Sequence, residues 1–220
     1  MNKMKITRKI HNLFYPKLGK ILMLHSVESA AFLESLVAKC RNEGFEPIGL
    51  DEAVDRIRKH SGKRFSCFTF DDGYLDTYSI AFPTLTRLGV PFCVYMTRDF
   101  YRGASQPVWD GAARMMNVGQ LKEMSLSQWC TIGVHTCTHP RLSTLDVNTQ
   151  RHEIADCKSD LEELLGKEIK HMAYPHGDYD NATLGVVSEL GFVTAVTTSG
   201  RHVRGDAKLL ELDRVFVGDR

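Results

Sequence analysis

From residue 20 onward, short runs of β-branched, aromatic and other apolar residues alternate with longer segments in which apolar residues recur at helical spacing. This alternation is typical of βα units wound around a mainly parallel sheet. The runs predict seven strands, at residues 21–25, 65–70, 92–97, 131–134, 171–174, 193–197 and 215–217. Seven such strands favour an α/β fold, a distorted (β/α)7 barrel, and the chain length suits one domain over residues 20–220.

The segments between the strands predict helices at residues 30–42, 50–60, 77–88, 147–165 and 181–189, and one more that ends at 126–129. Four glycines, Gly44, Gly89, Gly166 and Gly191, fall just past helix ends, where a left-handed cap favours glycine. Residues 101–120 form the least regular stretch, which we interpret as a loop insertion near one rim.

The amino-acid composition limits which substrates and which cellular compartment we expect. With 28 basic and 27 acidic residues, the protein has almost no net charge that would attract nucleic acid. We therefore expect a neutral or weakly charged substrate. The six cysteines contain no CxxC pair, which favours reduced thiols in the core. No apolar signal core or run of about 20 apolar residues is present. We therefore expect a cytoplasmic protein without a transmembrane segment.

Residues 1–19 are predicted to form a basic leader with Lys3, Lys5, Arg8 and Lys9. Part of it, residues 6–18, has the pattern of a short amphipathic stretch that touches a membrane surface. A solvated, loosely packed leader is the more ordinary interpretation.

Polar residues that could take part in catalysis or metal binding follow four predicted strands at their C-terminal ends. They are His25, Asp71 with Asp72, His135 with His139, and the stretch 174–177. In a barrel of parallel strands, the loops after the strand C-termini form the functional face. We therefore expect these four groups to converge on one site.

Two pairs among these residues suggest a metal ion. Asp71 and Asp72 adjoin a buried strand, where two carboxylates repel each other and need a cation or a proton, unless one of them simply caps the next helix. His135 and His139 are spaced so that one turn of chain brings both to one ion, although a lone HxxxH also fits surface histidines. Together the pairs favour a divalent metal site, from which the intervening Cys137 should point away.

The motifs TFDDG at residues 69–73 and HTCTH at 135–139 resemble the first two motifs of the NodB-homology polysaccharide deacetylases, carbohydrate esterase family 4. AYPHG at 173–177 stands in the place of the third, and the resemblance covers most of the chain from about residue 20. It implies a hydrolase that removes acetyl groups from an N-acetylated sugar or glycan with a divalent ion, zinc first and cobalt or nickel as alternatives. The resemblance also implies roles for single residues: Asp71 is the base, Asp72, His135 and His139 bind the metal, and Thr136 braces the metal loop.

The sequence departs from the third motif, which usually begins with an arginine that orients the base. Ala173 occupies that position, and we consider Arg214 as a substitute, although its neighbour Asp213 would also suit an ordinary surface ion pair. The backbone N–H of His176 would stabilise an oxyanion, with Tyr174, two positions earlier, among the substrate-binding residues.

A second departure is that no Leu-x-His motif occurs near the C-terminus, where the family keeps its general acid. LMLHSV at residues 22–27 resembles the first strand of circularly permuted members, which makes His25 the expected acid. A barrel tolerates such a permutation because its first and last strands are neighbours. Taken alone, a histidine that ends an apolar strand is more often structural.

Two other functions stay open. The scaffold could hydrolyse another carbon–nitrogen amide, such as a formyl group or a small cyclic amide, or it could be a non-catalytic sugar-binding relative. Retention of both Asp71 and His25 argues against pure binding, which needs neither acid nor base. For stacking on a sugar, Trp109 in the irregular loop is a better candidate than Trp129 or Tyr74. The sequence leaves the oligomeric state open.

Overall fold

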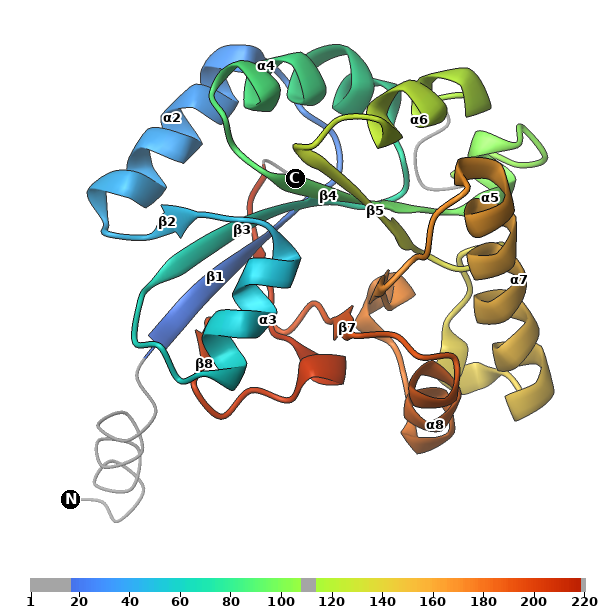
Figure 1. Ribbon diagram of the computed structural model, residues 1–220. Coiled ribbons are helices and arrows are strands. Elements are labelled where there is room, and N and C mark those ends of the chain that lie inside the picture. Colours follow the sequence, from blue (N-terminus) through green and yellow to red (C-terminus); the bar gives the residue numbers. More distant parts are fainter. Residues whose placement is uncertain (1–16, 108–113, 219–220) are drawn as a thin grey trace.

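One strongly curled, mainly parallel sheet organises the molecule (Figure 1). The computed structural model describes residues 17–107 and 114–218. All seven predicted strands are present: β1 (Lys17–Leu24), β3 (Phe65–Phe70), β4 (Phe92–Met96), β5 (Cys130–Val134), β6 (His171–Ala173), β7 (Thr194–Val196) and β9 (Val215–Phe216). Because β1 begins at Lys17, the last residues that we assigned to the basic leader belong to the sheet. Residues 1–16 of that leader lie outside the described residues.

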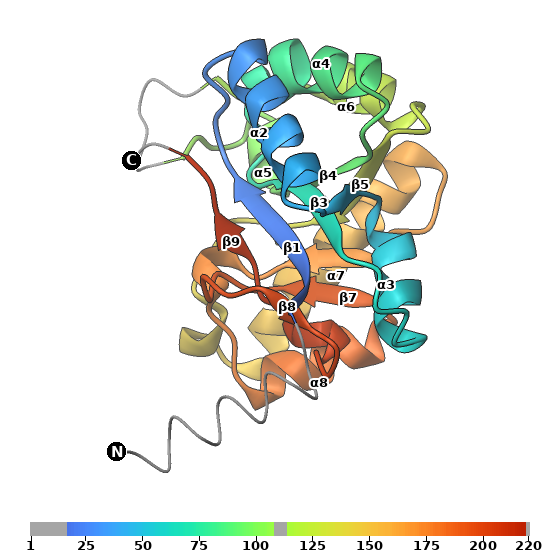
Figure 2. The ribbon, with the colours of Figure 1, turned by 90° about the vertical axis from the view of Figure 1, so that its left-hand side faces the viewer.

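The strand order is β7-β6-β5-β4-β3-β1-β8, with β2 (Glu46–Pro47) beside β3 and β9 beside β1 (Figure 2). The two-residue strands β2 and β8 (Val203–Arg204) were not predicted, because so short a run carries no periodic signal. A bridge between Val196 and Leu212 links the far edge of the sheet to the segment that leads into β9. The predicted distorted barrel is thus confirmed as an α/β fold whose sheet curls into a half-barrel.

Most helices cover the outer face of this curl (Figure 1). They are α2 (Ala30–Asn42), α4 (Phe82–Arg87), α5 (Arg98–Tyr101), α6 (Val118–Ser125), α7 (Val147–Leu165) and α8 (Asn181–Glu189), while α3 (Leu50–Arg58) packs against the inner core. The helix predicted over 77–88 begins with a π-helical turn, Thr77–Ala81. None of the helices in the described ranges is long and apolar enough to cross a membrane.

The predicted end of one helix at 126–129 is wrong, because α6 already ends at Ser125. Its start is fixed by a capping box in which Asn117 and Gln120 bond to each other's backbone N–H groups. Leu126, which we expected inside the helix, is 84% exposed.

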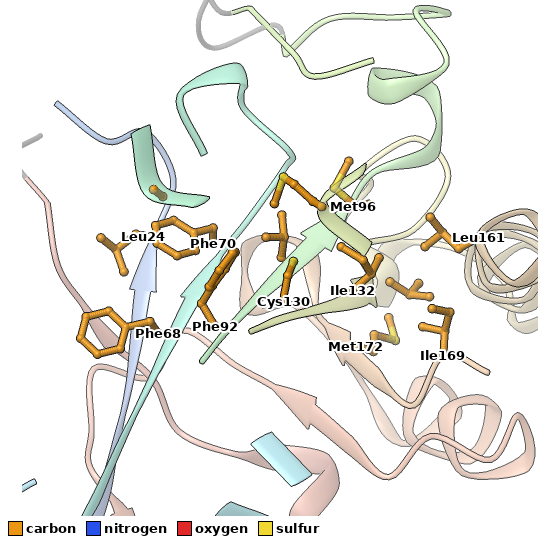
Figure 3. Packing of buried hydrophobic residues seen from close by; sticks show 14 of the residues in the cluster. Leu24, Phe68, Phe70, Phe92, Met96, Cys130, Ile132, Leu161, Ile169 and Met172 are labelled. Atoms are coloured by element: carbon orange, nitrogen blue, oxygen red, sulfur yellow. The ribbon is translucent and has the colours of Figure 1, made fainter. Parts of the chain in front are cut away.

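Strand alternation divides the buried residues into two cores. Phe68, Phe70 and Phe92 share the larger core cluster with residues of the outer helices such as Leu161 (Figure 3), whereas Cys67 and Tyr95 belong to the smaller cluster inside the curl. All six cysteines are free and buried, as predicted. The same alternation decides which strand-end residues face the inside of the sheet.

Candidate metal centre and active site

The polar residues at the strand ends continue the inward-facing set of side chains. Cys67 and Thr69 face inward on β3, so Asp71, two residues further on, does so as well. Inward-facing Ile21 on β1 is followed at the same spacing by Met23 and His25. A cavity of about 360 Å³ results, lined by Met23, His25, Asp71, Asp72, His135, His139, His176 and Thr198.

Three of these side chains gather as metal ligands would. Asp72, His135 and His139 each offer one ligand atom, and the three atoms lie within 4.8 Å of one another. Asp72 Oδ1 lies 3.6 Å from Nε2 of His135 and 3.3 Å from Nε2 of His139. All three side chains are at most 7% exposed.

The partner of His135 Nδ1 fixes the tautomer that a metal site needs. Nδ1 lies 2.8 Å from the carbonyl oxygen of Ala173, which can only accept a hydrogen bond. Nδ1 therefore carries the proton, and the lone pair of Nε2 points toward Asp72. Such a second bond from a ligating imidazole to a backbone carbonyl is the usual support of a protein metal ligand.

The electrostatics of the cluster favour a bound cation. Neither oxygen of Asp72 has a hydrogen-bond partner among the described residues. Burial and the neighbouring charge of Asp71 raise the pKa of Asp72 well above its ordinary value. Burial lowers the pKa of His135 to about 4, and burial with the charges of His135 and His176 lowers the pKa of His139 to about 2. Two neutral imidazoles facing an unsatisfied carboxylate fit a divalent ion.

Backbone strain is concentrated at the same rim. Among the described residues, five that are not glycine have a positive φ: His60, Asp72, Thr136, His139 and His176. Four of the five belong to the loops around the cavity. Left-handed backbone is unfavourable for such residues and persists where the surrounding structure enforces it, which is typical of functional sites.

The loop that carries His139 is held from two sides. Thr136 Oγ1 accepts a hydrogen bond from the backbone N–H of His139 at 3.1 Å, so it contacts the loop as expected. From α7, Glu153 Oε2 accepts from the N–H groups of Cys137 and Thr138, each at 2.9 Å, and Oε1 accepts from the Thr138 hydroxyl at 2.7 Å. Cys137 is not part of the ligand cluster.

The second carboxylate, Asp71, is paired with Arg214 rather than with the metal cluster. Arg214 Nη1 donates to Asp71 Oδ1 at 2.7 Å, and Nη2 donates to Oδ2 at 2.6 Å. Arg214 also donates to Thr69 Oγ1 and to the carbonyl of Thr197, and it is fully buried. Burial would raise the pKa of Asp71, but the charge of Arg214 and its hydrogen bonds outweigh it and hold that pKa well below its usual range. The alternative of a surface ion pair with Asp213 is excluded.

Only some of the other predicted site residues lie at the cavity. His25 Nε2 lies 4.0 Å from Asp71 Oδ2, in the wall of the cavity. His176 reaches the cavity from the turn after β6. The side chain of Tyr174 points elsewhere: it is buried, and its hydroxyl donates to the Leu210 carbonyl at 2.9 Å. Trp109 lies outside the described residues.

Comparison with known proteins decides the family. The model of a family described as "Polysaccharide deacetylase" matches residues 58–195, more than half of the chain. The chain belongs to the polysaccharide deacetylase family. YxkH of Bacillus subtilis (strain 168), whose name places it with the polysaccharide deacetylases, is 28% identical over 206 residues, which cover 90% of this chain and 70% of YxkH. The family resemblance seen in the motifs is confirmed.

Solved polysaccharide-deacetylase structures share the fold. The Streptococcus pyogenes deacetylase PplD, solved in complex with acetate, superposes with a TM-score of 0.78 at 25% identity and covers 90% of this chain and 91% of its own. IcaB from Ammonifex degensii gives a TM-score of 0.79 at 27% identity, with 92% of each chain covered. The deacetylase domain of BpsB from Bordetella bronchiseptica, at 19% identity and a TM-score of 0.74, covers 90% of this chain and 95% of its own and shows the fold alone.

Three residues of this polysaccharide deacetylase site were missed from the sequence. Met23 and Thr198 line the cavity, and Glu153 holds the metal loop. Met23 precedes His25 by two positions on a strand, so alternation could have identified it. Thr198 and Glu153 have no local signal, because their contacts depend on how β7 and α7 pack.

Proposed function

We propose that this polysaccharide deacetylase is a metal-dependent hydrolase that removes N-acetyl groups from an N-acetylated sugar or glycan. The observation that supports it is one cavity with three kinds of group: the triad Asp72, His135 and His139, the Arg214-bound carboxylate of Asp71, and the imidazole of His25. Amide hydrolysis needs an electrophilic centre, a base for water and an acid for the amine.

The triad would hold the ion through one carboxylate oxygen and the Nε2 atoms of His135 and His139. A divalent ion bound there would polarise the acetamide carbonyl and lower the pKa of water. Two imidazoles and one carboxylate suit zinc, which we propose, with cobalt and nickel as alternatives.

Two residues of the chain carry out the two proton transfers. Asp71 accepts a proton from the attacking water, and Arg214 fixes the orientation of its carboxylate. His25 donates a proton to the nitrogen as the carbon–nitrogen bond breaks, so that acetate and a free amine leave. The backbone N–H of His176 stabilises the charge that develops on the carbonyl oxygen.

The proposal includes a circularly permuted motif order, with the acid on the first strand. Two observations support it. His25 directly follows β1, and β9 pairs with β1 in parallel register, so the first and the last strand of the described chain lie side by side (Figure 2). His25 and Arg214 both lie outside the range that the family model matches.

Acetate release from N-acetylglucosamine oligomers by zinc-loaded protein tests this function. We expect release to need the metal and to fall about 10²–10⁴-fold in Asp71→Asn, which keeps the side-chain volume but removes the base. Equal release by the variant would rule out Asp71 as the base. Formate release from N-formylglucosamine, with no acetate from any acetylated sugar, would replace the proposal with its formyl alternative.

A further inference from the structure

A second hollow adjoins the metal cavity and has no role in the chemistry described so far. Its volume is about 190 Å³, and it is lined by His25, Ser26, Glu28, Phe32, Phe216, Val217 and Gly218. The hollow shares His25 with the metal cavity, so this imidazole forms the wall between them.

The proposed reaction determines on which side of His25 the sugar lies. The acetyl carbonyl must face the triad, and the amide nitrogen must face His25, which protonates it. In an N-acetylated sugar, the pyranose ring is bonded directly to this nitrogen. The ring therefore extends past His25, away from the triad and toward the hollow.

Phe216 gives this hollow an aromatic surface. Its side chain is 41% exposed, and among the described residues only Leu126 and Val147 are other large hydrophobic residues with as much exposure. The ring centroid of Phe216 lies 6.1 Å from that of His25. Pairing of Phe216 with Met23 in the sheet holds the ring at the edge of the catalytic cavity. An exposed aromatic face can bury the apolar C–H face of a pyranose.

The polar groups of the hollow suit hydroxyls rather than phosphate. Glu28 and Ser26 are exposed on the loop between β1 and α2, and the Ser26 hydroxyl donates to Asp76 Oδ2 at 2.5 Å. Neither lysine nor arginine lines the hollow within the described residues. A phosphorylated or diphosphate-linked group at this position would meet a carboxylate with no compensating cation.

Another cavity near the site, of about 370 Å³, is less well placed to hold the sugar that is bonded to the reacting nitrogen. It meets the metal cavity at Thr198, beside the turn of His176 and not beside His25. Its charged groups also pair with one another, as Arg201 does with Asp213 and Lys208 with Glu211.

The geometry points to a sugar subsite in the hollow beside His25, where the neutral pyranose ring that carries the reacting amide stacks on Phe216. This inference rests on the proposed hydrolase function and adds the position and chemistry of the sugar.

The test compares a sugar substrate with a small acetyl ester that has no ring. We would measure kcat/KM of the zinc-loaded protein for tetra-N-acetylchitotetraose and for trifluoroethyl acetate, in the wild type, Phe216→Ala, Phe216→Leu and Phe216→Trp. The ratio of sugar to ester kcat/KM should fall about tenfold in Phe216→Ala, the effect of losing roughly 1.4 kcal/mol of contact. It should fall in Phe216→Leu as well and be retained in Phe216→Trp.

Leu126→Ala is the matched control, because it removes an exposed apolar side chain that lines neither cavity. Its ratio should equal that of the wild type. A ratio that stays constant in Phe216→Ala, or one that returns to the wild-type value in Phe216→Leu, would overturn the subsite and leave Phe216 as packing for His25, because leucine keeps an apolar side chain beside His25 but offers no ring face. Ester hydrolysis without any sugar turnover by the wild type would instead contradict the proposed function itself.

Discussion

Arg214 and Asp71 stand 143 positions apart in the chain and form a buried, two-pronged ion pair, with N–O distances of 2.7 and 2.6 Å. Arg214 directly precedes β9, and Asp71 directly follows β3. The pair connects the closing segment of the curled sheet to the catalytic cavity. The motif resemblance led us to look for such an arginine at position 173, where Ala173 instead supplies the carbonyl that holds His135.

Removal of the guanidinium should leave the buried Asp71 carboxylate without its compensating charge. We expect Arg214→Met to lower the free energy of unfolding of the metal-free protein by about 3–5 kcal/mol, measured by urea titration. Adding Asp71→Asn to this variant should recover much of the loss, because the uncompensated charge of Asp71 is then removed. Strictly additive losses would contradict a direct energetic coupling of the two residues.

The contacts of Glu153 predict an effect on metal affinity. Because Glu153 accepts three hydrogen bonds from the loop between the two histidines, Glu153→Ala should loosen His139 and weaken zinc binding about 10–100-fold in a competition titration with a chelator. The visible spectrum of the cobalt-loaded variant should also change, since it reports ligand geometry.

Glu163→Ala is the control for this experiment, because Glu163 is exposed on the same helix. It removes an equal charge and the same side chain. Similar zinc affinities for the two variants would show that the loop keeps its shape without Glu153.

The raised pKa of Asp72 predicts a pH effect on the metal-free protein. The unfolded chain loses this proton near the ordinary carboxyl pKa of about 3.9, whereas the folded chain keeps it to higher pH. Rising pH in that window should therefore cost the wild type up to about 1.4 kcal/mol of stability per pH unit relative to Asp72→Asn. Asparagine also tolerates the φ of 70° at this position. Parallel stability curves from urea titrations at several pH values would refute the prediction.

The acid role of His25 predicts a dependence on the leaving group. His25→Gln should lower kcat for an N-acetylated sugar about 10²–10⁴-fold, because the amine cannot leave without a proton. Hydrolysis of trifluoroethyl acetate should suffer much less, since its alcohol leaves more readily. An equal loss for both substrates would assign His25 a positional role.

Local patterns were enough to predict the strands and the site rim. An apolar run such as 65–70 must be buried, and the polar residue that ends it lies at the sheet edge, so Asp71 and His135 could be placed from the sequence. The common rim of parallel strands then brings them together. The helix over 147–165 was equally clear, because its apolar spacing and the glycine just past its end, Gly166, agree, and the structure adds an N-cap at Asp146.

Contacts that depend on long-range packing could not be predicted in the same way. Nothing in the helical pattern separates Glu153 from Glu163, and only the packing of α7 brings the former under the metal loop. The sequence suggested Arg214 by its place at the last strand, but its pairing depends on the closure of the curl. Leu126 shows a different error, since an apolar residue just after a helix end was taken as part of the helix.

Anomalous diffraction at the zinc edge, from crystals of the zinc-loaded protein, tests the metal centre most directly. The account predicts one strong peak within about 2.0–2.2 Å of Nε2 of His135, Nε2 of His139 and a carboxylate oxygen of Asp72. A peak bound elsewhere, or none at this cluster while the protein holds zinc in solution, would contradict it.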